Sequence, residues 1–209
     1  MVLAGKIALY LTVFLSGIAA GGFLEKYLRE ALRKRGILSQ YKMTGIVNGL
    51  LWLWVSQGRW TGAESLLCCL CASLLLAVAV VDARAFEIPL ECNLGIGLLG
   101  AARVYLSHGN LAEYLVGAFA ASGIFLAIFA LTGDGIGGGD IKLMAAGGLF
   151  LGSGKILLAL FIGSAVGLLC QLPLVKLAGK SRYFALGPYL ALGIGTAMVY
   201  GDKIINRWL

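Results

Sequence analysis

The sequence predicts an all-α, polytopic membrane protein with about eight transmembrane segments, within a range of six to eight. Two observations support this class. Of the 209 residues, 60% are hydrophobic and only 13% are charged, whereas about 25% of the residues of a soluble domain are charged. The charged residues also fall between long apolar runs, which is the pattern expected of a chain surrounded by lipid.

Eight apolar segments follow one another along the chain. Because a straight transmembrane helix needs about 20 residues, the second and the sixth segments are short. We expect these two to be tilted, extended by neighbouring residues or partly re-entrant. The segments cover approximately residues 3–23, 44–57, 63–81, 92–107, 112–132, 140–152, 154–175 and 183–201.

Lysine and arginine residues predict the orientation of these segments. Four loops carry 11 of the 17 Lys and Arg residues: 24–42, 82–91, 133–142 and 176–182. Since cytoplasmic loops are enriched in these residues, we expect all four loops at the cytoplasmic face and both termini outside. The apolar spacing after residue 23 remains helical, which predicts an amphipathic extension of the first helix near anionic lipid. We divide the chain into an N-terminal two-helix region, 1–62, and a transmembrane core, 63–209.

Several common kinds of site are not expected. Six of the basic residues lie in one short segment beside an apolar run, where such charge sets the topology, so no nucleic-acid partner is predicted despite the net charge of +7. The five cysteines include no Cys-x-x-Cys pair, and His108 is the only histidine. Neither a zinc site nor catalysis through histidine is therefore predicted.

Carboxylates beside membrane segments are the strongest candidates for chemistry, because they are costly to bury. Five of the ten acidic residues fall in two of the predicted cytoplasmic loops: Asp82, Glu87, Glu91, Asp134 and Asp140. Asp82 directly follows an apolar run, and Asp140 directly precedes one. Both aspartates are therefore expected at the same membrane surface.

Asp140 ends a stretch rich in glycine, Gly133-Asp134-Gly135-Ile136-Gly137-Gly138-Gly139-Asp140. Glycine permits positive φ angles and the close approach of a second backbone, which suits an extended peptide substrate. Nucleotide binding is a weaker interpretation, because the pattern G-x-x-x-x-G-K-[ST] is absent. Close helix packing is the structural alternative, and it accounts better for Gly147 and Gly148.

Three short blocks of sequence carry a family resemblance. Residues 137–144, GGGDIKLM, are similar to a GxGD-(V/I)-K-L signature. The spacing D-x5-(I/L)-P-(D/N)-x-x-(T/N) is matched by Asp82, Ile88, Pro89 and Asn93. Residues 183–193, YFALGPYLALG, resemble a last membrane span that contains an FGP motif. In this order, the three blocks resemble the type IV prepilin peptidases, a family of GxGD membrane aspartic peptidases.

The resemblance implies a membrane-embedded aspartic endopeptidase. Such an enzyme cleaves the basic leader of type IV prepilin, pseudopilin or competence-pilin precursors at the cytoplasmic face of the cell membrane. Asp82 and Asp140 are the expected catalytic pair and share one proton. Because Asp82 ends a helix and Asp140 begins one, helix dipoles predict that Asp82 holds this proton. The residues expected to bind substrate or shape the loops are Ile88, Pro89, Asn93, Gly137, Gly138, Gly139, Lys142, Gly187 and Pro188.

The sequence also departs from the family pattern. The stretch 24–42 is short and lacks the zinc-binding cytoplasmic insertion of the long form. Leu90 stands where many members have Asp or Asn, and Gly45 stands in place of a glutamate. Proteolysis is expected to need no cofactor and no metal. The family's second activity, N-methylation of the new N-terminus from S-adenosylmethionine, is associated with the shortened region and is expected to be weak or absent.

Alternatives stay open at this point. A transporter or channel would use Asp82 and Asp140 to bind a cation or relay protons. A non-catalytic assembly factor would tolerate the loss of either aspartate. Asp134 is a rival of Asp140, and Glu87 and Glu91 are either recognition groups for a basic leader or solvated loop acids. Lys142 either orients the loop or anchors it at the interface. The expected partners are prepilin-like proteins and membrane lipid, and the oligomeric state is not predicted.

Overall fold

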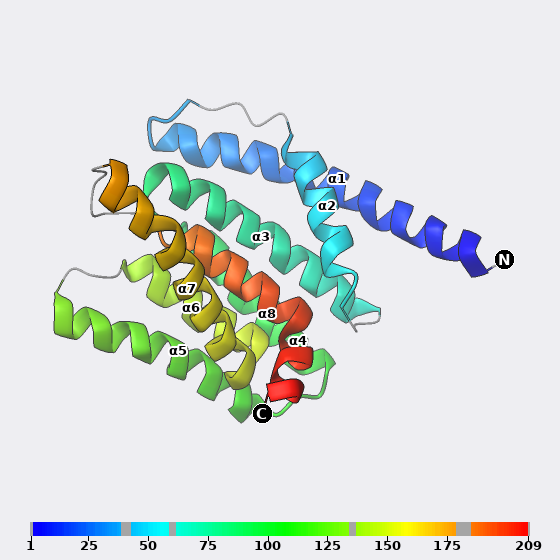
Figure 1. The fold of residues 1–209 in the computed structure, drawn as a ribbon. Coiled ribbons are helices and arrows are strands. Elements are labelled where there is room, and N and C mark those ends of the chain that lie inside the picture. The colour runs from blue at the N-terminus through cyan, green and yellow to red at the C-terminus, as the bar shows by residue number, and fades with distance from the viewer. Residues whose placement is uncertain (1, 39–42, 59–61, 134–136, 179–184, 209) are drawn as a thin grey trace.

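The computed structural model describes residues 2–38, 43–58, 62–133, 137–178 and 185–208. Within these ranges the chain forms eight α-helices and no strand, which confirms the all-α class (Figure 1). Each helix corresponds to one of the predicted apolar segments. The helices are α1 (Val2–Lys34), α2 (Thr44–Val55), α3 (Ala63–Ala85), α4 (Leu90–Leu106), α5 (Leu111–Thr132), α6 (Gly138–Leu151), α7 (Ser153–Ala178) and α8 (Gly187–Trp208).

In the described part of the chain, four helices are long and apolar enough to cross a membrane, namely α1, α3, α5 and α7. Helices α2 and α6 have 12 and 14 residues, below the ~20 that a straight span needs, as the sequence predicts. The first helix continues without interruption to Lys34, which confirms the predicted extension beyond the apolar segment. Helix α8 begins at Gly187 rather than at the predicted residue 183; Pro188 in its first turn explains a start there, since proline is favoured at helix N-termini.

Helices α1 and α2 pack through facing glycines. A Cβ atom added to Gly17 would lie 2.8 Å from the Cα of Gly49, and one added to Gly21 would lie 2.6 Å from the Cα of Gly45. Glycines four residues apart on both helices therefore let the two backbones touch. A Cβ atom at Gly45, which departs from the family pattern, would lie 3.3 Å from the carbonyl oxygen of Ile18 in α1, a tight contact that favours glycine here.

A buried polar network connects this helix pair to α3. Asn48 donates to the carbonyl oxygen of Gly17 at 2.8 Å, and Ser73 of α3 donates to Asn48 Oδ1 at 2.8 Å. The indole of Trp52 completes the network by donating to Ser73 Oγ at 2.8 Å. Because each buried group in this chain of contacts has a partner, the network stabilises one arrangement of the three helices.

Helix α3 occupies the middle of the bundle. It contacts α1, α2, α4 and α8, and in Figure 1 it runs between the α1–α2 pair and the layer that contains α5. Its C-terminal end lies at the same end of the molecule as the C-terminal end of α1 and the beginning of α8. The loops that carry the predicted site residues therefore meet at one end of the bundle.

Candidate active site

A polar pocket of about 380 Å³ lies at this end of the bundle. It brings together the C-terminal turn of α3, the α3–α4 loop, the beginning of α4 and the beginning of α6. Both predicted aspartates belong to it, although they are 58 residues apart in the sequence (140 minus 82). The lining residues are Asp82, Phe86, Glu87, Ile88, Leu90, Asn93, Gly137, Gly138, Gly139, Asp140 and Lys142.

Asp82 is held by the first residue of α8. The backbone N–H of Gly187 donates to Asp82 Oδ2 at 2.8 Å, and the aspartate is 5% exposed. A Cβ atom at position 187 would lie 2.7 Å from the same oxygen. Glycine is therefore the residue that allows this backbone to approach the carboxylate so closely.

Asp140 lies in the first turn of α6, whose N-cap is Gly137. Its carboxylate interacts electrostatically with that of Asp82. The Oδ1 atom of Asp140 is buried and has no hydrogen-bond partner among the described residues. Since a buried carboxylate oxygen without a partner is costly, this atom is poised to bind a proton, a water molecule or a substrate group.

The glycine stretch provides room rather than unusual backbone angles. Gly137 is extended and Gly138 and Gly139 are helical, so the positive φ angles expected from the sequence are absent at these three described positions. A Cβ atom at Gly139 would lie 3.0 Å from that of Ile88, whereas one at Gly138 would meet nothing within 4 Å. Gly139 therefore lets the α3–α4 loop approach α6, and Gly138 leaves space in the pocket.

Asn93 and Pro89 position the loop that faces the glycines. Asn93 is 4% exposed, and its side-chain amide donates to the carbonyl oxygen of Gly139 at 3.3 Å. Pro89 is the N-cap of α4 and does not line the pocket. Pro188 lies outside it too: it lines an apolar cavity between α2, α3 and α8.

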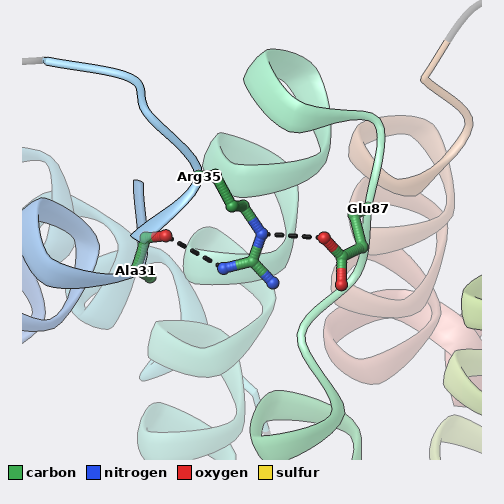
Figure 2. Close-up of polar contacts among 3 residues, drawn as sticks. All are labelled: Ala31, Arg35 and Glu87. Atoms are coloured by element: carbon green, nitrogen blue, oxygen red, sulfur yellow. Dashed lines mark hydrogen bonds and ion pairs between the residues drawn. The ribbon is translucent and has the colours of Figure 1, made fainter. Parts of the chain in front are cut away.

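Glu87 makes the only ion pair of the pocket lining among the described residues. Arg35 Nε donates to Glu87 Oε2 at 2.9 Å (Figure 2). The Arg35 guanidinium holds the pKa of this glutamate below its usual range. Lys142 is exposed at the rim, and none of the ion pairs recorded for the described part of the chain includes it.

Three residues of the site carry no clear signal in the sequence. Phe86 has a left-handed backbone with φ 54°, Leu90 replaces the polar residue expected by family pattern, and Arg35 lies far away in the chain. Asp134, the rival of Asp140, and Tyr183 and Phe184 of the third block lie outside the described residues.

No metal centre accompanies this pocket in the described part of the chain. Groups of three or more His, Cys, Asp or Glu side chains arranged to hold a metal ion are absent there. The five cysteines are free, and four of them are buried, where they act as small packing residues.

Comparison with known proteins identifies the sequence family. Residues 69–172 match the model of the type IV leader peptidase family. A prepilin leader peptidase/N-methyltransferase of Aeromonas hydrophila is 30% identical over 181 residues, which cover 82% of this chain and 62% of that protein. A Bacillus subtilis protein of the same name is 36% identical over 141 residues, covering 66% and 56%.

The chain spans about three fifths of the length of these two curated relatives. A Legionella pneumophila relative with the same name is 33% identical over 144 residues, or half of its length. No solved structure gives a significant match. The matched region contains both pocket aspartates, Asp82 and Asp140, and the chain belongs to the type IV leader peptidase family.

Proposed function

We propose that the protein is an aspartic endopeptidase that removes the leader peptide of prepilin-like precursors at the cytoplasmic face of the cell membrane. The observation that carries the proposal is the pairing of Asp82 and Asp140 in one pocket. Hydrolysis of an amide by two carboxyl groups needs one to accept a proton from water and the other to protonate the carbonyl oxygen. The relatives, which are named prepilin leader peptidases, supply the substrate class.

The hydrogen bonds suggest how the two groups divide this work. A donor to a carboxylate stabilises its charged form, and Asp82 receives the N–H of Gly187. The N–H of Gly137 also stabilises the charged form of Asp140, but the Oδ1 atom of Asp140 is buried without any partner among the described residues. Asp82 is therefore the proposed base, and Asp140 the proposed holder of the proton. This order is the reverse of the one that the helix dipoles alone predict.

The reaction then proceeds in two steps. Asp82 accepts a proton from the attacking water while Asp140 donates its proton to the carbonyl oxygen of the scissile bond, forming a tetrahedral intermediate. The intermediate collapses when Asp82 passes the proton taken from water to the nitrogen of the leaving peptide, the C–N bond breaks, and a hydroxyl of the intermediate returns its proton to Asp140. The space beside Gly138 admits the extended backbone around the scissile bond.

The arrangement of the loops supports a single catalytic face. The segment after α1, the α3–α4 loop, the beginning of α6 and the beginning of α8 are connected by the contacts of Arg35, Asp82 and the pocket. The first three segments belong to the four loops that together carry 11 of the 17 Lys and Arg residues, and α8 begins shortly after the fourth of these loops, 176–182. The positive-inside rule then assigns this end of a multi-pass bundle to the cytoplasm.

Methyl transfer is not part of the proposal, although the names of the relatives include N-methyltransferase. A polar pocket of about 450 Å³ outside the site is lined by residues of α1 alone: Gly22, Glu25, Lys26, Arg29, Glu30 and Arg33. It offers no aromatic ring for an adenine base to stack on, and charges of both signs line it. These residues do not fit S-adenosylmethionine. From the shortened N-terminal region we expect weak or absent methyl transfer, so mass spectrometry should show a trimmed product without an added methyl group.

Purified enzyme and prepilin-like precursors test the peptidase proposal. Asp82→Asn and Asp140→Asn should each lower the cleavage rate by about 10²- to 10⁴-fold, because an amide cannot shuttle the proton. The double variant should lose little more, since the two residues act as a unit. Asp202→Asn is the matched control. This aspartate pairs with Lys155 outside the pocket, so the variant should cleave the precursor at the wild-type rate. A single pocket variant that keeps more than about a tenth of wild-type activity, ~1.4 kcal/mol of barrier, would refute the dyad.

A further inference from the structure

One ion pair connects the end of α1 to the candidate site. Arg35 Nε donates to Glu87 Oε2 at 2.9 Å, and Glu87 lines the pocket that holds Asp82 and Asp140. We propose that Arg35 is a positioning residue for the reaction, which acts through Glu87 to hold the α3–α4 loop against the glycine stretch. This inference rests on the proposed function, because it concerns the same pocket.

The backbone around Arg35 is fixed by the way α1 ends. Gly36 has φ 75°, its N–H donates to the carbonyl oxygen of Arg33 at 3.0 Å, and the N–H of Ile37 donates to that of Leu32 at 2.9 Å. This pair of hydrogen bonds is a Schellman motif, which ends a helix at a defined residue. Ile37 also packs against the hydrophobic core. Arg35 therefore extends from an anchored turn.

The guanidinium of Arg35 is held at two points. While Nε donates to Glu87, Nη1 donates to the carbonyl oxygen of Ala31 at 2.9 Å (Figure 2). The N–H of Arg35 bonds to Leu32 instead of Ala31, so the side chain satisfies a carbonyl left over at the helix end. A planar group oriented in this way loses less entropy on pairing than a free lysine would.

Glu87 lies between the two residues that define the shape of the loop. On one side, Phe86 has a left-handed φ of 54°, a strained angle for a bulky residue that persists only where its surroundings hold it. On the other side, Ile88 is 8% exposed and packs against Gly139 in the turn before Asp140. Restraining Glu87 therefore also restrains the contact between Ile88 and Gly139. This contact keeps the end of α3 and the beginning of α6, which carry the two aspartates, in fixed positions relative to each other.

Four variants test the inference in the cleavage assay: Arg35→Gln, Glu87→Gln, the double variant, and the charge exchange Arg35→Glu with Glu87→Arg. Because the pair is partly exposed, each single variant should lower kcat by about two- to fivefold, with KM unchanged. The double variant should match the singles, and the charge exchange should restore most of the lost rate. Arg29→Gln is the control, since it removes a pair of similar length, to Glu25 within α1, and should leave kcat unchanged.

Other results would overturn the inference. If Arg35 only caps α1, Arg35→Gln lowers the unfolding temperature while Glu87→Gln keeps full activity. If Glu87 instead binds the substrate, Glu87→Gln raises KM, Arg35→Gln has no effect and the charge exchange fails to restore the rate. If wild type cleaves the precursor and all four variants cleave it at the same rate, the positioning role alone is refuted. If wild type cleaves no precursor, the proposed function is refuted as well.

Discussion

Glycine serves opposite purposes in the α1–α2 pair and in the candidate active site. Between α1 and α2, Gly21 and Gly45 remove side chains so that two backbones come into contact. In the pocket, Gly138 faces open space. The comparison teaches that what lies opposite a glycine decides its role: an opposing backbone makes it a packing residue, and an empty volume makes it part of a binding site.

Among the glycines, the largest effect is expected where both roles combine, at Gly187. Gly187→Ala places a Cβ atom 2.7 Å from Asp82 Oδ2, so the carboxylate must move. A displacement of about 1 Å at a reacting group costs on the order of 10²-fold in rate, and we expect a loss of this size in the cleavage assay. Gly123→Ala, whose Cβ atom would meet nothing within 4 Å, is the control. Wild-type activity of Gly187→Ala would show that the contact with Asp82 is unimportant.

The packing glycines should affect stability and leave the chemistry unchanged. Gly21→Ala brings a Cβ atom 2.6 Å from the Cα of Gly45, and such overpacking costs typically about 1–3 kcal/mol. Unfolding in detergent, followed by tryptophan fluorescence, measures this cost. The neighbouring Gly22→Ala, which meets nothing within 4 Å, should be as stable as wild type. Equal stability of the two variants would argue against backbone contact between α1 and α2.

The pocket glycine should show the opposite behaviour. Gly138→Leu fills the open space with an apolar side chain, so we expect KM for the precursor to rise by up to about tenfold, ~1.4 kcal/mol. The unfolding free energy should stay close to that of wild type, because the Cβ atom meets nothing within 4 Å and the side chain extends into the open pocket. Steady-state kinetics and the same unfolding measurement separate the two effects. A large loss of stability would place Gly138 with the packing glycines.

The smallest effect is expected at the ion pair that joins the two regions. Arg35 lowers the pKa of Glu87, so the folded protein binds fewer protons at this group than the unfolded chain does. The contribution of the pair to stability is therefore present above the ordinary glutamate pKa of about 4.3 and is lost as the pH falls through the lowered value. Wild type should unfold at a slightly higher temperature than Glu87→Gln at pH 7, and the difference should disappear on acidification. A difference that persists in acid would exclude the ion pair as its cause.

The helices and the two aspartates were accessible to sequence reasoning because their signals are local. Apolar runs predict each helix to within a few residues at most ends, and the spacings around Asp82 and Asp140 predict that both meet at one surface. These predictions use the composition of short stretches of sequence and the membrane face at which each helix begins or ends. Neither requires knowledge of which helices are neighbours.

The remaining features depend on contacts between distant segments. The donor to Asp82 is a backbone N–H that lies 105 residues away, and a backbone group has no signature of its own. Gly21 and Gly45 each have a second glycine four residues away on the same helix, which is the spacing of packing glycines, but the sequence does not specify that the two helices face each other there. Likewise, Arg35 cannot be distinguished from Arg33 or Lys34 in a basic run until the turn at Gly36 fixes the direction of its side chain.

The hydrogen bond from Gly187 to Asp82 also has a consequence for biosynthesis. Both aspartates are translated before α8, so a nascent chain that has inserted α1 to α7 already carries both pocket aspartates. The donor that orients Asp82 arrives only with the first turn of α8. The pocket is therefore complete only after α8 has docked beside α3.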